Sequence, residues 1–129
     1  MIDLTWYYTL NQPPLNPPAH VFAPAWAALY TMIFISLVIF AAKRTDESKA
    51  LGYVLFFSQM ILNLAWSPVF FVFHNIVLAL AILILLDILV YFNIREFYLV
   101  SKKSAYFLIP YFLWILYATY LNIGFFVLN

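Results

Sequence analysis

Residues 76–94 read IVLALAILILLDILVYFNI, a stretch in which Asp87 is the only charged residue. A transmembrane helix needs about 20 consecutive, predominantly apolar residues, and this stretch has that length. A strand of a membrane barrel would need only about 9–11 residues and would alternate in polarity. We therefore expect residues 76–94 to form a membrane-spanning helix.

Three further stretches share these features, at residues 21–42, 51–73 and 105–127. The composition agrees, because 67% of the 129 residues are hydrophobic and 9% are charged, against about 45–50% and about 25% in soluble domains. In water such a chain would expose too much apolar surface. The sequence predicts an all-α integral membrane protein, an antiparallel bundle of four spans. We expect a single domain over residues 1–129 that begins with a loop over residues 1–20.

All six basic residues lie in two segments that we expect to be loops, residues 43–50 and 95–104. Both segments should face the same side of the membrane, because an even number of expected spans separates them. The positive-inside rule assigns that side to the cytoplasm. We therefore expect residues 1–20, the short His74-Asn75 turn and the C-terminus to face the opposite side.

Several classes of function are disfavoured by what the sequence lacks. It has no cysteine, which removes disulfides, thiolate metal sites and cysteine nucleophiles. His20 and His74 have no second ligand nearby, so we expect no metal site. A net charge of +1 provides no basic patch for nucleic acid. Paired carboxylates within one span and glycine-rich phosphate loops are also missing, so a conventional enzyme is not expected.

Residues 6–24 combine five of the seven prolines with aromatic residues such as Trp6 and Tyr7. Proline interrupts helices, so we expect no regular helix before Val21. The apolar side chains need a surface to rest on. We interpret the segment as an ordered lid, with the loop over residues 13–18 stiffened by proline. An aromatic belt at the membrane surface is the alternative.

Aromatic and amide side chains recur at helical spacing within three of the expected spans. The sets are Gln59, Asn63 and Trp66; Trp114, Ala118 and Asn122; and Phe22, Trp26 and Tyr30. Residues three or four positions apart share a helical face, and lipid is a poor solvent for polar groups, so these faces should point into the bundle. Together they could line an aromatic pocket for a flat hydrophobic ligand. Ordinary core packing, with the amides only joining helices, remains the alternative.

Asp87 is the most costly residue in the spans. A charge at the centre of a bilayer costs at least about 2.5–3.5 kcal/mol. We expect Asp87 to be protonated, paired across a helix or facing water. A proton relay would normally include further carboxylates or histidines, and the other spans supply none. The sequence therefore favours an interhelical hydrogen bond over a transport role.

Three blocks of residues resemble the translocator protein / tryptophan-rich sensory protein family (TspO/MBR), also called the peripheral-type benzodiazepine receptor family. The first block comprises Trp6-Tyr7, Leu10, Pro13, Pro17-Pro18, Val21-Phe22, Pro24, Trp26 and Leu29-Tyr30; the second comprises Gln59, Leu62-Asn63, Ala65-Trp66, Pro68 and Phe70-Phe71; the third comprises Pro110-Tyr111, Trp114, Ala118-Thr119 and Leu121-Asn122. Their order and spacing cover nearly the whole chain, which makes the resemblance specific.

The resemblance implies a five-helix bundle, usually a homodimer, that binds porphyrins, haem-related tetrapyrroles, sterols and synthetic drug-like ligands beneath the first loop. No resident cofactor is required. The ligand-binding positions implied are Tyr7, Trp26, Tyr30, Asn63, Trp66, Phe70, Trp114, Ala118 and Leu121. We expect a porphyrin-binding membrane sensor or translocator. Light-dependent porphyrin degradation through Trp26 and Trp114 is one alternative, and a structural membrane scaffold without a ligand is another.

The sequence also departs from the family pattern. The family has a helix before the Trp-Tyr pair, and here only five residues precede Trp6. We expect four spans in this chain, which is either a true four-span variant or a sequence with a truncated start. Leu15 and His20 replace two family tryptophans, and Leu78 stands where many animal members have tryptophan. The cholesterol-recognition pattern near the end of the chain is not met, because the last basic residue is Lys103.

Overall fold

The structure is a computed structural model that describes residues 5–11, 22–46 and 48–129. The helices, in chain order, are α1 (Thr5–Tyr8), α2 (Phe22–Ala42), α3 (Ala50–Phe71), α4 (Ile76–Val100) and α5 (Lys102–Leu128). The described residues contain no strand. Four of the helices are long and apolar enough to span a membrane. The prediction of an all-α, multi-pass helical bundle is therefore confirmed.

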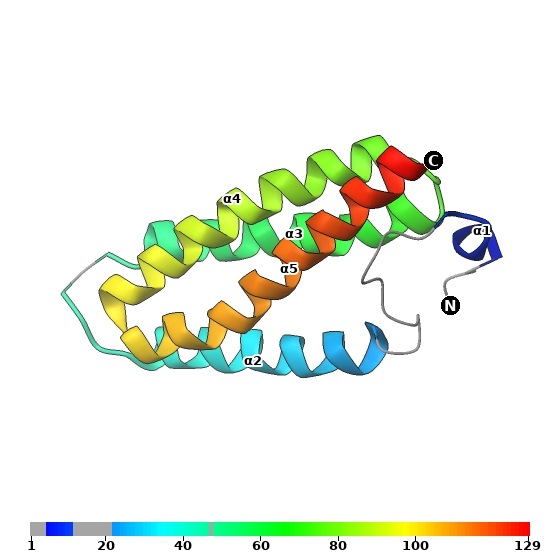
Figure 1. The fold of residues 1–129 in the computed structure, drawn as a ribbon. Coiled ribbons are helices and arrows are strands. Elements are labelled where there is room, and N and C mark those ends of the chain that lie inside the picture. The colour runs from blue at the N-terminus through cyan, green and yellow to red at the C-terminus, as the bar shows by residue number, and fades with distance from the viewer. Residues whose placement is uncertain (1–4, 12–21, 47) are drawn as a thin grey trace.

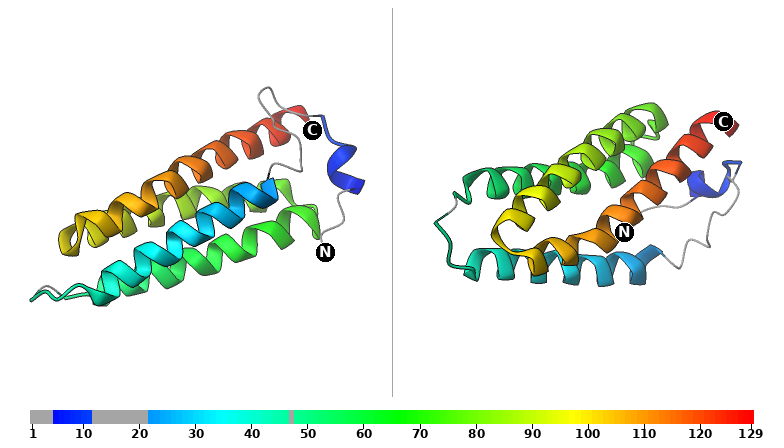
Figure 2. Two further views of the ribbon diagram at one scale, coloured as in Figure 1. Left: turned by 90° about the horizontal axis from the view of Figure 1, so that it is seen from below. Right: turned by 60° about the vertical axis from the view of Figure 1, so that its left-hand side comes forward.

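The long helices pack in an order that differs from their order in the chain. α2 packs chiefly on α5, α5 packs on α4, and α4 packs on α3. Figure 1 shows α5 running between α2 and α4, and the right-hand view of Figure 2 shows the same arrangement. Helices α2 and α3 follow each other in sequence, yet their backbones make far fewer close approaches than those of these three pairs.

The turn between α3 and α4 covers residues 72–75, so it is longer than the expected His74-Asn75 break, because α3 ends at Phe71 and not at Phe73. Pro68 lies within the last turns of α3, and its carbonyl accepts hydrogen bonds from the backbone N–H groups of Val72 (2.9 Å) and Phe73 (3.0 Å). His74 has a positive φ of 55°. The Asn75 side chain caps α4 by accepting a hydrogen bond from the backbone N–H of Leu78 at 2.9 Å. These bonds satisfy backbone groups that a helix end leaves open.

The prediction of a loop over residues 95–104 is wrong. α4 continues to Val100 and α5 begins at Lys102, so that Ser101 alone separates them. Ser101 is extended (φ −150°, ψ 116°), and its hydroxyl accepts a hydrogen bond from the backbone N–H of Ser104. Charge marks where the apolar stretch ends but not where the helix ends, because long charged side chains at the end of a helix can extend toward water.

The N-terminal segment also differs from the expectation of a plain loop over residues 1–20. Thr5–Tyr8 form a single helical turn, α1, which precedes the first proline of the segment. The loop over residues 13–18, interpreted as the central part of a lid, lies outside the described residues. So do Leu15 and His20.

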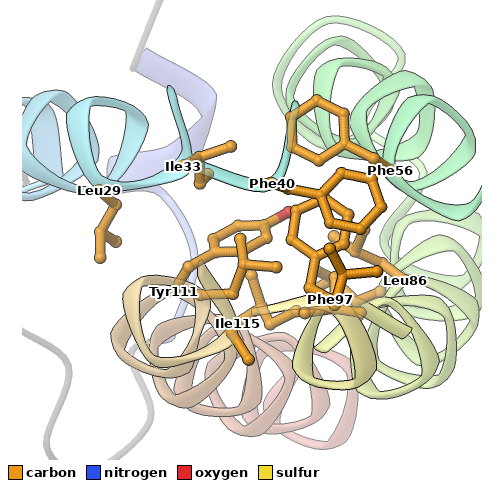
Figure 3. Close-up of a cluster of buried hydrophobic side chains, with 13 residues drawn as sticks. Leu29, Ile33, Phe40, Phe56, Leu86, Phe97, Tyr111 and Ile115 are labelled. Atoms are coloured by element: carbon orange, nitrogen blue, oxygen red, sulfur yellow. The ribbon is translucent and has the colours of Figure 1, made fainter. Parts of the chain in front are cut away.

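One end of the bundle is filled by stacked aromatic rings (Figure 3). Phe40 of α2 stacks on Phe97 of α4, with ring centroids 4.0 Å apart, and Phe56 of α3 stacks on the same ring at 5.9 Å. Phe40 fits because Gly52 faces it. A Cβ atom on Gly52 would lie 2.6 Å from Phe40 Cζ, far inside van der Waals contact. The glycine therefore allows α3 to approach this ring.

Two serines bring α2 and α5 together next to these rings. The Ser36 hydroxyl donates a hydrogen bond to the backbone carbonyl of Ser104, and the Ser104 hydroxyl donates one to the carbonyl of Ser36, both at 2.7 Å. Both residues are fully buried. Small residues at such crossings are typical of membrane helices, since they let backbones approach closely. We call this region, comprising Ser36, Phe40, Gly52, Phe56, Phe97 and Ser104, the packed end.

Candidate functional site

Two tryptophans meet where α2 and α5 face each other away from the packed end. Trp26 and Trp114 make an edge-to-face contact, with centroids 6.1 Å apart and planes at 87°. Trp26 also contacts Tyr30 at 5.6 Å and Tyr111 at 6.5 Å. Both tryptophans are only partly buried. The rings therefore form an aromatic wall, and part of the surface of both indoles remains accessible.

A chain of hydrogen bonds runs beside this wall and joins three helices. The Tyr30 hydroxyl of α2 donates to Asn63 Oδ1 of α3. Asn63 Nδ2 donates to the Tyr111 hydroxyl of α5 at 2.8 Å, and that hydroxyl donates to Gln59 Oε1 at 2.7 Å. Asn63, Tyr111 and Gln59 are buried, whereas Tyr30 is 36% exposed. The chain therefore runs from the bundle interior to an accessible hydroxyl.

We call Trp26, Tyr30, Gln59, Asn63, Tyr111 and Trp114 the aromatic site. Gln59 Nε2 is buried and has no hydrogen-bond partner among the described residues. An unpaired amide N–H in a buried position is costly. This NH2 group has two hydrogens that it could donate to a polar group.

A second group of aromatic residues lies at the end of the bundle near α1. Trp66 stacks on Phe70 with centroids 5.2 Å apart, and its indole N–H donates to Asn122 Oδ1 at 3.1 Å. Tyr7 of α1 is 4% exposed and packs with Phe70 and Leu121. We call Tyr7, Trp66, Phe70 and Leu121 the capped cluster, because α1 covers it.

Further contacts attach α1 and the segment after it to the bundle. The ring of Trp6 stacks on His74, with centroids 4.3 Å apart and planes at 10°. Asn11 exchanges hydrogen bonds with the last two residues of the chain: its backbone N–H donates to Asn129 Oδ1 at 3.1 Å and its side-chain amide donates to the Leu128 carbonyl at 3.0 Å. The first part of the segment that we interpreted as a lid, from Trp6 to Asn11, therefore contacts the bundle.

The residues expected to bind a ligand fall into these two groups. Trp26, Tyr30, Asn63 and Trp114 belong to the aromatic site, and Ala118 packs against the same core. Tyr7, Trp66, Phe70 and Leu121 belong to the capped cluster, and Trp66 borders both groups. Gln59 and Asn63 point into the bundle as the helical spacing predicts, because both are buried.

Tyr111 is the central residue that the candidate set did not include. It is fully buried and bonds to both amides of α3. Its spacing contained a signal, since Tyr111 lies one helical turn before Trp114 and residues three apart share a face. Proline at position 110 does not disturb that face, since α5 continues through it.

An open hollow of about 510 Å³ lies elsewhere, at the turn between α3 and α4. Its lining comes from the turn and the end of α5: Phe73, His74, Asn75, Ile76, Val77, Phe126 and Asn129. None of the residues expected to bind a ligand lines it. Among the described residues no three His, Asp or Glu side chains come together as a metal site would require.

Asp87 makes the interhelical contact that the sequence favours. Its Oδ2 atom lies 2.7 Å from the Thr119 hydroxyl oxygen of α5. The carboxyl therefore joins α4 to α5 in the middle of the bundle.

The fold and these contacts define a multi-pass α-helical membrane protein with aromatic and amide side chains gathered between its helices. Residues 2–128 match the family described as TspO/MBR. The chain is 37% identical to the tryptophan-rich protein TspO of Chlorobaculum tepidum, over 97% of this chain and 80% of that protein. It is 39% identical to the protein of the same name from Archaeoglobus fulgidus, with the same coverage. It is 33% identical to the human translocator protein, over 92% of this chain and 72% of that one. The chain belongs to the TspO/MBR family.

Proposed function

We propose that this protein binds a porphyrin, or another flat hydrophobic molecule such as a sterol, at the aromatic site and acts as a membrane sensor or translocator. The observation that carries the proposal is the contact between Trp26 and Trp114 across α2 and α5, beside a hydrogen-bond chain that ends at Tyr30. Relatives named tryptophan-rich sensory protein and translocator protein support the same role.

The binding chemistry follows from the side chains. A flat ring system stacks on indole and phenol rings, and each such contact is worth about 0.5–1.5 kcal/mol beyond the burial of surface. Tyr30, Asn63 and Gln59 supply the few polar anchors that orient an apolar ligand. Trp66, Phe70, Leu121 and Tyr7 complete the far wall of the site in this proposal. The protein needs no resident cofactor, and the tetrapyrrole is its ligand.

A porphyrin titration of the purified chain tests the proposal. Protoporphyrin is added to the protein in detergent and the shift of its Soret absorption is followed to saturation. We expect Trp26→Phe and Trp114→Phe each to weaken binding by about threefold to tenfold, the equivalent of one aromatic contact. Tyr91→Phe is the control, because Tyr91 is 56% exposed on the outer face of α4. If the chain and both tryptophan variants bind equally, the aromatic site is not the binding site. If the chain shows no saturable binding, it is a structural scaffold.

Light-dependent breakdown of the bound porphyrin is a second candidate, favoured by the direct contact between Trp26 and Trp114. In this version the two indoles act as photochemical electron donors. Illumination should then remove the Soret band and produce a new absorbing species, and both phenylalanine variants should abolish this change. A Soret band that survives illumination of the saturated wild-type complex excludes the candidate.

The proposal also includes an orientation and an assembly. Residues 43–50 and the basic residues near Ser101 face the cytoplasm, by the positive-inside rule, and the protein forms a homodimer in the bilayer. Because the chain has no cysteine, a single cysteine at position 48 or 129 reports orientation cleanly. An impermeant thiol reagent on intact cells should label Asn129→Cys and not Ser48→Cys. The reverse pattern contradicts the orientation.

A further inference from the structure

The Asp87 carboxyl and the Thr119 hydroxyl meet in an arrangement that constrains where the hydrogens lie. Thr119 Oγ1 lies 2.7 Å from Asp87 Oδ2 and 2.8 Å from the backbone carbonyl oxygen of Ile115. Both distances are those of normal O–H···O hydrogen bonds. A threonine hydroxyl has one hydrogen to donate and two lone pairs with which to accept.

An ionised Asp87 does not fit this arrangement. Both neighbours of the Thr119 hydroxyl would then be acceptors competing for a single hydrogen. The other carboxyl oxygen, Asp87 Oδ1, is buried and has no hydrogen-bond partner among the described residues. A carboxylate within the membrane would thus share one donor between its partner and a backbone carbonyl, although buried charges require several.

A neutral carboxylic acid accounts for both hydrogen bonds of the Thr119 hydroxyl. With a proton on Oδ2, Asp87 donates to Thr119 Oγ1, and Thr119 donates its own hydrogen to the Ile115 carbonyl. The remaining atom, Oδ1, is then the carbonyl oxygen of an uncharged acid, which tolerates an apolar environment far better than a carboxylate oxygen does.

Among the residues that the structure describes, no basic side chain is close enough to hold Asp87 in its charged form. Helices α2 and α3 contain no Asp, Glu, Lys, Arg or His. On α4, Arg95 lies eight residues further along, about 12 Å at 1.5 Å per residue. On α5, Lys102 and Lys103 occupy the first turn, more than four turns from Thr119. The other titratable side chains of α5 are tyrosines, namely Tyr106, Tyr111, Tyr117 and Tyr120, and a tyrosine carries no positive charge in either protonation state.

We propose that Asp87, together with Thr119, is a proton-binding site within the membrane: the side chain is held as a neutral carboxylic acid that donates a hydrogen bond to Thr119 and clamps α4 to α5. The site is separate from the aromatic site, and the proposal does not depend on ligand binding.

Infrared spectroscopy of the full chain in lipid nanodiscs at pH 7 tests the site directly. Aspartate labelled with ¹³C at its side-chain carboxyl marks only Asp3, Asp46 and Asp87. We expect an isotope-sensitive carbonyl stretch of a protonated acid in the wild type. Asp87→Asn should remove it, and Asp46→Asn, a change on the exposed loop, should leave it. Absence of the band in the wild type, or its survival in Asp87→Asn, overturns the proposal.

Two further measurements decide the question even if Asp87→Asn does not fold. The double variant Asp3→Asn, Asp46→Asn leaves Asp87 as the one labelled carboxyl without altering the site. Thr119→Val keeps the shape of the side chain but removes the acceptor, and should move the band to higher frequency. An unchanged frequency contradicts Thr119 as the partner. A carboxylate band in the double variant that shifts when sodium is replaced by choline identifies a cation site and also overturns the proposal.

Discussion

The packed end and the aromatic site are formed by the same helices, but the helices pack more closely at the packed end. At the packed end, small residues let α2 and α5 approach until side chains bond directly to the opposite backbone, and Phe40 and Phe97 are fully buried. At the aromatic site, Trp26 and Trp114 stand between the same two helices and are only partly buried. Side-chain size therefore divides one helix pair into a closely packed region and a region whose aromatic rings remain partly accessible.

The largest effect should come from filling the space over Gly52. Gly52→Leu places carbon atoms where Phe40 already lies, since even a Cβ would be 2.6 Å from the ring. We expect the free energy of unfolding to fall by about 3 kcal/mol, the upper end of typical overpacking costs. Thermal unfolding of the detergent-solubilised protein measures this change.

If porphyrin affinity falls together with stability in this variant, the packed end and the aromatic site are not independent, and the distinction between them is wrong. Ala81→Val is the matched control. It enlarges an exposed residue of α4, and it should leave both stability and affinity unchanged.

A middle-sized effect is expected from Tyr111→Phe. The change removes the hydroxyl that joins Asn63 to Gln59 and leaves two buried amides short of a partner. We expect a loss of about 1–2 kcal/mol in the free energy of unfolding. Porphyrin binding should weaken as well, since in the proposed mode of binding the same amides orient the ligand.

Tyr106→Phe on the same helix is the control for this change, because Tyr106 is 55% exposed. If both variants unfold at the same temperature as the wild type, the hydrogen-bond chain does not stabilise the bundle. The aromatic site would then depend on ring contacts alone.

The smallest effect is expected from Ser36→Ala. It removes the bond that the Ser36 hydroxyl donates to the Ser104 carbonyl and keeps the one that Ser104 donates. Interhelical hydrogen bonds in membranes average about 0.6 kcal/mol, so the unfolding midpoint should drop only slightly. Porphyrin affinity should not change. A loss as large as that of Gly52→Leu would show that this bond, and not ring packing, dominates the packed end.

Much of the candidate site could be predicted from spacing alone. Asn63 and Gln59 had to face the bundle because lipid penalises amides, and both are buried. The pairing of Trp26 with Trp114 could not be predicted in the same way, since it depends on α2 lying against α5 instead of against α3. Spacing places Tyr111 on the same face as Trp114, but the hydrogen bonds of its hydroxyl to Asn63 and Gln59 could not be predicted, because they depend on how α5 lies relative to α3.

The number and nature of the spans followed from composition and length, because each helix satisfies its own backbone and the bilayer solvates its apolar side chains one helix at a time. Family membership likewise rests on residues read in order. Tertiary structure decided what depends on two or more helices at once: the turn at Ser101, the fit of Phe40 over Gly52 and the three-helix hydrogen-bond chain through Tyr111. Lipid solvates every apolar helix face equally well. Only contacts between particular side chains therefore select which helix faces meet.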